Sequence, residues 1–289
     1  MRYDLPFFGG FLPPAWYGVS TGATETYDGT SFSEVNDLNQ TRRALQGAGV
    51  STNSSLAFGG YQDSAPVNPG FSPLMQKMTE EWNGTNWSTS TNASLSYGQY
   101  DAQMIGTQND TIKGVGFPQN ANAAHYDGTS WASINAYNDD RQSRAGFGTA
   151  NAAIYAGGRG GSNTGCPHTE EYNGTNWSVG TAFPLDSEGT NLLPLAPAGP
   201  DPAGKAGTGA QNAALVFGGG SHYQTPRNSG SAFEYDGTAF TQVAFMPENM
   251  ERHIGAGTQN ATISYGGYKR SMSSPYPTQT NDYAHTWNG

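Results

Sequence analysis

The sequence predicts an all-β fold built from six copies of one unit, and three observations lead to this prediction. A hairpin signal recurs along the chain: an aromatic residue, then Asn-Gly or Asp-Gly, then a second aromatic in the copies that are complete. In most copies a short apolar run ending in Gly-Gly precedes this signal, and a glycine-rich segment precedes that run. Self-similarity at a fixed period indicates a ring or stack of equal parts. We therefore expect a single domain over residues 1–289, although the length alone would suggest two.

The hairpin signal is clearest at residues 169–178. Asn173-Gly174 separates two β-prone runs, and Asn-Gly is a strong signal for a two-residue type I′ turn. With this turn Tyr172 and Trp177 are diagonal neighbours on one face and pack together. We expect hairpins near residues 24–33, 79–88, 123–132, 169–178 and 232–241, and the first half of one at 284–289. The aromatic residues to which we assign a structural role in them are Tyr27, Trp82, Trp87, Tyr126, Trp131, Tyr172, Trp177 and Tyr235.

Two more strands are predicted in each unit, before the hairpin. The apolar run, such as residues 215–219, predicts a strand buried on both faces. The glycine-rich segment before it, such as residues 145–149, has side chains small enough for the crowded axis of a ring. Each unit then has four strands, named a to d from the inside to the outside. Basic residues stand just upstream of several strands a, namely Arg42, Arg43, Arg141, Arg144, Lys205 and Arg252.

The repeat length and its motifs resemble a known family. Intervals of 55, 44, 46, 63 and 52 residues separate the aromatics that precede the turns, and a repeat near 50 is the kelch period. The Gly-Gly doublet followed by a Tyr and then a Trp resembles kelch repeats over nearly the whole chain. More narrowly, the phrase at residues 256–261 and the motif Glu-Tyr-Asn-Gly-Thr-x-Trp are similar to the kelch-like repeats of structural proteins of tailed marine bacteriophages. The third copy, at residues 112–117, departs from the Gly-Gly pattern.

The resemblance implies a six-bladed kelch-like β-propeller of four-stranded antiparallel blades, with the ring closed between the chain ends. Counting strands along the chain, the first unit lacks strand a and the last lacks strand d. We therefore expect residues 280–287 to be either a solvent-facing edge or an edge that a neighbouring subunit completes, because unpaired edges recruit strands.

Composition and charge exclude several classes of function. The formal charge of −10, with 13 basic residues spread along the chain, gives no basic stripe for nucleic acid. No run of 18 apolar residues is present, so we expect no membrane insertion. Residues 1–10 do not read as a signal peptide, and the lone Cys166 excludes an intrachain disulfide. A phage component, made in the host cytoplasm and released by lysis, fits a polar surface without an export signal. The expected location is thus the virion, with an extracellular protein as the alternative.

The predicted binding face is the one with the long loops. Connections a–b and c–d are short, whereas connections b–c and d–a are long and are where binding residues accumulate. Aromatic rings with arginines between them suit a flat sugar face or a protein partner. The alternative is that these rings pack down their own loops. The candidates are Trp16, Tyr17, Tyr61, Phe71, Arg159, Tyr223, Arg227, Tyr268, Arg270 and Tyr276.

Catalytic and metal sites are not expected. The five histidines fall in five different units without ligand spacing, so we predict no metal and no cofactor. Some kelch-like propellers are copper radical oxidases, but Cys166 and the histidines do not match that arrangement. A glycosidase needs two carboxylates facing one cleft. The carboxylates that qualify by position only, and that solvation in loops explains, are Asp63, Asp139, Asp140, Asp186 and Glu188.

The function expected from these points is that of a non-enzymatic phage virion structural protein, either a capsid decoration, a fibre or a tail-associated propeller. Its partners would be other virion proteins or further copies of itself, with host-surface glycans as an addition. A glycan-binding adhesion module is the alternative, and a propeller enzyme such as a copper radical oxidase or a glycosidase is the third class.

Overall fold

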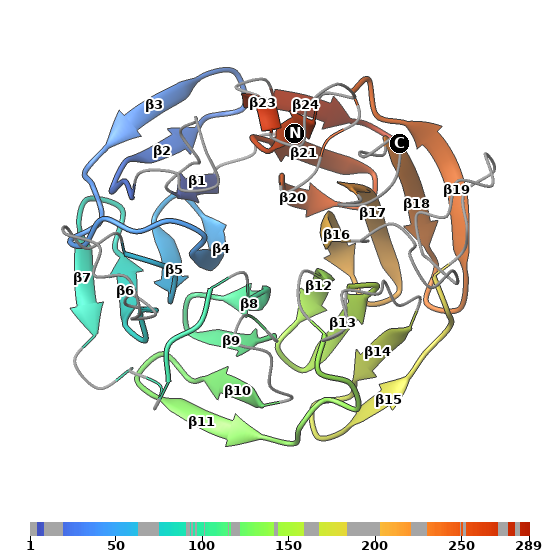
Figure 1. Cartoon of the computed structure of the whole chain (residues 1–289), viewed down its shortest axis with the longest axis horizontal. Helices are drawn as coiled ribbons and strands as arrows, with labels where there is room; N and C mark the ends of the chain where they lie inside the picture. The colour runs from blue at the N-terminus through green and yellow to red at the C-terminus, as the bar shows by residue number, and fades with distance from the viewer. Residues whose placement is uncertain are drawn as a thin grey trace.

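The computed structural model describes most of the chain as a ring of antiparallel sheets around a central axis (Figure 1). The described residues are 5–8, 20–62, 75–90, 93, 95, 97–100, 102–114, 116, 122–141, 144–158, 168–183, 203–220, 230–248, 250, 253–270, 277–280 and 284–289, with the backbone alone for 5–8, 203–205, 220, 268–270 and 277–280.

Four units are complete blades whose strands follow one another from the axis outward, so strands a to d pair in chain order. Unit two consists of β4 (Gln46–Ser51), β5 (Ser54–Phe58), β6 (Thr79–Trp82) and β7 (Trp87–Ser90). Unit three consists of β8 (Met104–Thr107), β9 (Asp110–Lys113), β10 (Ala123–Tyr126) and β11 (Trp131–Ile134). Unit four consists of β12 (Ala145–Thr149), β13 (Ala152–Ala156), β14 (Thr169–Tyr172) and β15 (Trp177–Val179). Unit five consists of β16 (Ala203–Ala210), β17 (Ala213–Gly220), β18 (Ser231–Tyr235) and β19 (Phe240–Phe245).

The two end units are incomplete. Unit one is a partial sheet of β1 (Leu5–Phe8), β2 (Thr24–Tyr27) and β3 (Phe32–Val35), which correspond to strands b, c and d. Unit six contains β20 (Ile254–Thr258), β21 (Ala261–Tyr265) and β24 (Ala284–Trp287), which correspond to a, b and c. Between β21 and β24 lies a separate pair, β22 (Tyr268–Arg270) and β23 (Pro277–Thr280).

The predicted closed ring of six four-stranded blades is therefore wrong. The described residues form five blades, the last with three strands, and one partial sheet. The physical reason is that no described strand supplies the inner place of unit one or the outer place of unit six, and none of the described strands pairs the first unit with the last. The two ends meet through side chains instead. The ring centroids of Phe32 and Tyr265 lie 4.6 Å apart, and the Tyr265 hydroxyl donates to Glu25 Oε2 at 3.2 Å.

The hairpins form where they were predicted, but their register differs from the predicted one. Tyr172 lies directly opposite Trp177 and not diagonal to it, so the loop has four residues and the expected two-residue type I′ turn is wrong. The Asn173 side chain explains this, because its Oδ1 accepts from the backbone N–H of Thr175 (3.0 Å) and Asn176 (2.9 Å). Gly174 has φ +88°, which favours glycine at this place. The Tyr172 and Trp177 rings stack with centroids 4.7 Å apart.

Neighbouring units are joined by a recurring bond from the first aromatic of strand d to the first residue of the preceding strand c. Trp87 Nε1 donates to Thr24 Oγ1 at 3.1 Å, and Trp131 Nε1 donates to Thr79 Oγ1 at 2.9 Å. At the next junction Ala123 takes the place of the threonine, because it is the first residue of its strand c.

This substitution and a second one leave two buried atoms unpaired. Trp177 Nε1 is buried with no partner among the described residues, opposite the alanine of unit three. One junction further, Phe240 takes the place of the tryptophan, and Thr169 Oγ1 is buried with no partner in the same described part of the chain. At each of these two junctions an apolar residue, Ala123 or Phe240, stands where the hydrogen-bond partner lies at the other junctions.

On the face with the short turns, glutamines of the a–b turns reach back to the preceding unit. Gln108 Nε2 donates to the backbone oxygen of Trp82 at 2.8 Å, and Gln211 Nε2 donates to that of Tyr172 at 3.1 Å. Turns a–b and tips c–d therefore lie together on one face of the ring. Connections b–c and d–a leave the sheets at the opposite face, which we call the loop face.

Candidate functional site

The Gly-Gly doublets turn the chain at the loop face. Gly59 and Gly60 both have positive φ, +66° and +92°, a conformation that other residues adopt only with strain. This turn directs the Gly59 carbonyl toward the guanidinium of Arg42, whose Nη1 donates to it at 2.6 Å. In unit four Arg141 Nη1 makes the same bond to the Gly157 carbonyl, also at 2.6 Å.

Each of these arginines forms a buried ion pair with strand c of its own unit. Arg42 Nη2 lies 2.7 Å from Glu80 Oε1, and both side chains are fully buried. Arg141 Nη2 lies 3.3 Å from Glu170 Oε1. Burial lowers the pKa of Arg42, and the negative charge of Glu80 opposes that shift. Because a buried charge is costly when unpaired, these arginines are fixed parts of the scaffold and not free ligands.

The linkers between units complete these sites. Asn39 donates its backbone N–H to Glu80 Oε2 at 2.8 Å, and Asn138 donates its backbone N–H to Glu170 Oε2 at 3.1 Å. Three residues earlier, Asn36 and Asn135 bind the tip of the next hairpin. The sequence signal is Asn-x-x-Asn-x-x-Arg, which occurs in both linkers. The arginines stand out in the sequence as basic residues upstream of strands a, whereas neither their glutamate partners nor this spacing was predicted.

Above the second ion pair lies the one exposed carboxylate–imidazole contact found on the described part of the loop face. Asp139 Oδ2 lies 3.0 Å from His168 Nδ1, and the two side chains are 40% and 51% exposed. The pKa of Asp139 is lowered, first by this hydrogen bond and also by the charges of Arg141 and Arg144. Since the nearby Glu170 is held by Arg141, the arrangement is a neutralised ion network and lacks the pair of free carboxylates that a glycosidase uses.

Unit three has a different buried cation in this region. Lys113 is fully buried, and its Nζ donates to Gln99 Oε1, to the Gly114 carbonyl at 3.1 Å and to the Asn122 carbonyl at 3.3 Å. These acceptors are neutral, and burial lowers the pKa of Lys113 to about 7. Ala124 stands where units two and four have the paired glutamate, which is why the ion pair is missing here.

Of the ten predicted binding residues, Tyr61 has a described side chain. The guanidinium carbon of Arg43 lies 4.2 Å from the centre of its ring, and the Tyr100 ring meets it edge-on with centroids 5.8 Å apart. These contacts match the alternative in which loop aromatics pack against their own surroundings. Tyr268 and Arg270 lie on β22, where the backbone alone is described. The others lie outside the described residues, namely Trp16, Tyr17, Phe71, Arg159, Tyr223, Arg227 and Tyr276.

The eight aromatics to which a structural role was assigned lie at the junctions between units. Seven of them are buried, and Trp131 is partly buried. The Tyr126 hydroxyl donates to Glu81 Oε1 of the preceding unit, and the Tyr235 hydroxyl donates to Glu171 Oε1 at 2.7 Å in the same way. Burial and the glutamate raise the pKa of both tyrosines.

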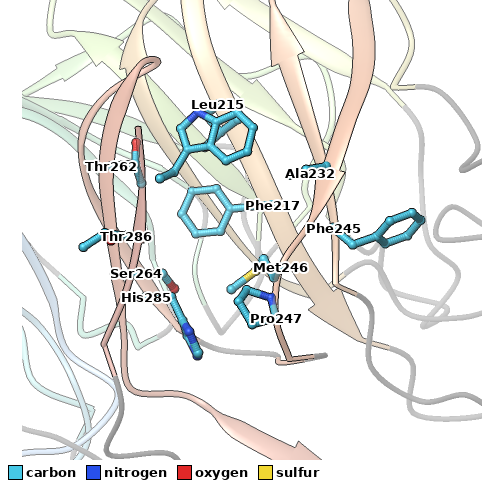
Figure 2. Close-up of a pocket in the computed structure, with 12 residues that line it drawn as sticks. Leu215, Phe217, Ala232, Phe245, Met246, Pro247, Thr262, Ser264, His285 and Thr286 are labelled. Carbon is cyan, nitrogen blue, oxygen red and sulfur yellow. The ribbon is translucent and has the colours of Figure 1, made fainter. Parts of the chain in front are cut away.

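A groove that was not predicted from the sequence lies between units five and six. It has a volume of about 60 Å³ and a mainly apolar lining. Figure 2 shows the Phe217 ring pointing into it, with Ala232 and Met246 on the side of unit five and Ser264 and His285 on the side of unit six. On the side of unit six the groove is lined from β24, along whose outer edge no described strand pairs.

No protein-family model and no curated protein matches the chain. Among solved structures, that of the protein YjhT is similar, with a TM-score of 0.67 over 100% of this chain and 99% of that chain, at 11% sequence identity. At this identity the likeness shows the β-propeller fold alone. The described residues contain no helix that could span a membrane and no group of three or more metal-binding side chains.

Proposed function

We propose that this chain is a non-enzymatic structural component of a tailed phage particle, a decoration, fibre or tail-associated propeller that acts through protein partners in the virion. The likeness of its repeats to the kelch-like repeats of marine phage structural proteins supports the setting. A part in assembly or in surface attachment agrees with a chain whose formal charge is −10.

The observation that carries the proposal is that the buried ionisable side chains bond to other parts of the scaffold. In an enzyme, such groups are expected to point into a cleft where chemistry occurs. Here Arg42 and Arg141 fasten Gly-Gly turns to strands c, and Tyr126 and Tyr235 fasten one unit to the next. The same bonds recur at equal places in different units, as expected of a protein whose task is to hold its shape.

The glycan-binding alternative has less support. Tyr61, a predicted aromatic platform, has one face occupied by Arg43. It remains a separate proposal that the loop face binds sugar through the aromatics that lie outside the described residues.

Purified particles of the phage that encodes the chain provide the test. We expect quantitative mass spectrometry to find the chain in a fixed number of copies per particle after a density gradient, and immunogold labelling to place it at one part of the particle. Recovery of the chain only from the soluble fraction of the lysate would refute the virion role. A glycan array on the purified chain tests the alternative, which predicts sugar binding that Tyr223→Ala removes without changing the melting curve.

A further inference from the structure

The Lys113 side chain is a fully buried amine whose described contacts include no carboxylate. Its Nζ donates to Gln99 Oε1, to the Gly114 carbonyl at 3.1 Å and to the Asn122 carbonyl at 3.3 Å. An ammonium group has three N–H donors, so these three oxygens can satisfy all of them. The oxygens are neutral, however, so the hydrogen bonds leave the positive charge without a balancing negative charge.

The sheet around Lys113 does not supply this negative charge. The two sheet neighbours of Lys113 are apolar residues, Met104 on β8 and Ala124 on β10. At the place of Ala124, units two and four have the glutamates Glu80 and Glu170, each paired with a buried arginine. Burying a cation without such a partner is costly, which favours the neutral amine. Burial accordingly lowers the pKa of Lys113 to about 7.

The other titratable groups described around Lys113 keep their charge near neutral pH. The centre of the Tyr97 ring lies 5.4 Å from Nζ, and the Tyr137 hydroxyl donates to the Lys113 carbonyl at 2.5 Å. Burial raises the pKa of Tyr97, of Tyr137 and of Tyr155, whose ring meets that of Tyr137 edge-on. The guanidinium carbon of Arg144 lies 5.0 Å from the centre of the Tyr137 ring, and arginine stays protonated in proteins. Between pH 7 and pH 9, Lys113 is therefore the group of this set that changes its charge.

The bonds of Lys113 span the junction between units two and three. Lys113 is the last residue of β9 in unit three, whereas Gln99 lies in the linker that follows unit two. The Gln99 carbonyl accepts from the N–H of Gly60 at 2.8 Å, and the Gln99 N–H donates to the Gln76 carbonyl at 3.2 Å. Gly60 belongs to the Gly-Gly turn of unit two, and Gln76 precedes β6 of the same unit. Gln99 thus connects the Lys113 amine to two segments of unit two at the loop face.

We propose that Lys113 makes the junction between units two and three sensitive to pH, so that uptake of a proton by its amine favours local opening of this junction while the rest of the ring stays folded. Opening places the ammonium group in water and breaks its contact with Gln99. In the open junction the pKa of the amine returns to its usual 10.5, whereas in the closed junction it is about 7. The open form therefore binds the proton more readily between these values, and opening is favoured as the pH falls from 10.5 to 7. The inference does not depend on the proposed virion role.

Native-state hydrogen exchange of the 289-residue chain at pH 7 and pH 9, followed by mass spectrometry, tests this proposal. The reporters are the amide of Gly60, bonded to the Gln99 carbonyl, and the amide of Gly114, bonded to the Gln103 carbonyl at 2.6 Å. Exchange is expressed as protection factors, which remove the direct effect of pH on the exchange reaction. We expect both protection factors to be about tenfold or more lower at pH 7 than at pH 9, because one proton shifts the opening equilibrium up to about tenfold per pH unit. The amide of Gly157, in the Gly-Gly turn of unit four, is the internal control and should keep its protection.

Two variants assign the effect to Lys113. Lys113→Met keeps a side chain of similar length without a titrating amine, so the two reporter amides should have the same protection at both pH values. Gln99→Glu keeps the amine and gives it a carboxylate partner, which favours the charged form and should also remove the pH dependence. Urea melts of both variants check that the fold is kept, and Gln99→Glu decides the question if Lys113→Met does not fold.

Three results would overturn the proposal. Equal protection of Gly60 and Gly114 at pH 7 and pH 9 in the wild type would show that the junction does not respond to the charge of Lys113. An equal fall in protection at Gly157 would show that the whole ring unfolds and not one junction. A fall in Lys113→Met or in Gln99→Glu as large as that in the wild type would assign the response to a different group.

Discussion

Replacing Trp131 and Trp177 by phenylalanine should have different effects on stability, although both residues are strand-d aromatics at a junction between units. Trp131 donates to Thr79 Oγ1, whereas the buried Nε1 of Trp177 has no partner among the described residues, because Ala123 stands where a threonine would accept. The pair of substitutions therefore separates the hydrogen bond from the packing of the ring.

The expected magnitudes follow from this contrast. Trp→Phe removes apolar area worth about 1 kcal/mol at either position. Trp131→Phe also loses a hydrogen bond worth about 0.5–1.5 kcal/mol, so we expect a loss of about 2 kcal/mol in the free energy of unfolding. Trp177→Phe removes a buried unpaired donor whose burial costs about 1–3 kcal/mol, which offsets the lost packing and leaves stability within about 1 kcal/mol of the wild type.

Equilibrium urea denaturation of both variants measures the difference. Thr79→Val is the control, because it removes the acceptor of Trp131 Nε1 together with the bond that the Thr79 hydroxyl donates to the Ala93 carbonyl at 2.5 Å, and it should cost about 1–3 kcal/mol. Combined with Trp131→Phe, it should cost less than the sum of the two single changes. If Trp177→Phe destabilises the protein as much as Trp131→Phe does, the hydrogen bond from Trp131 Nε1 to Thr79 does not stabilise the junction between units.

Three further predictions concern the scaffold. Arg42→Met leaves a buried carboxylate unpaired and should cost about 3–5 kcal/mol in a guanidinium melt, and a loss below about 1 kcal/mol would contradict the buried pair. Gly266→Ala should lower the free energy of unfolding by roughly 1–2 kcal/mol because of its φ of +69°. Gly218→Ala has a similar φ of +67° but should cost more, because an added Cβ would lie 1.9 Å from His253 Cε1. Equal losses of stability in urea melts would contradict this packing. Burial lowers the pKa of Lys113 from 10.5 to about 7, so between these pH values the unfolded chain binds the proton more readily than the folded one. The free energy of unfolding of the wild type, relative to that of Lys113→Met, should therefore rise from pH 7 to pH 9.5 in urea melts. A difference that stays constant with pH would show that Lys113 is solvated.

The positions of the hairpins could be predicted from the sequence because their signal is local. An aromatic, an Asx-Gly pair and a second aromatic fall within six residues, and the structure has a hairpin at each complete copy. The register could not be obtained this way, because Asn173 bonds the backbone two and three residues ahead and widens the loop to four residues. The prediction of a closed six-bladed ring was wrong at the chain ends, because the sequence signals of the two incomplete units do not show whether these units close the ring.

The ion pairs and the groove depend on contacts between distant parts of the chain. Arg42 and Glu80 are 38 residues apart, and nothing in either segment alone indicates the other. The groove joins residues of β17 and β18 to β24, and no described strand pairs with the outer edge of β24, so no local motif predicts the groove. The predicted loop aromatics other than Tyr61 lie where no side chain is described, and their role stays a prediction.

The arginine–glutamate pairs of units two and four lie at equal places in their units, so a deletion that joins one unit to the other can keep or break such a pair. Gln99 stands seven residues before Gly106, as Arg141 stands seven before Gly148. Deleting residues 100–141 would remove one blade and leave Gln99 facing Glu170, so that this buried carboxylate would lose Arg141 and keep only Arg144, at 3.9 Å. Deleting residues 43–141 would remove two blades and bring Arg42 to Glu170 with its linker asparagines in place. The two shortened chains should therefore differ in stability, because the second keeps an arginine at the place of Arg141 and the first does not.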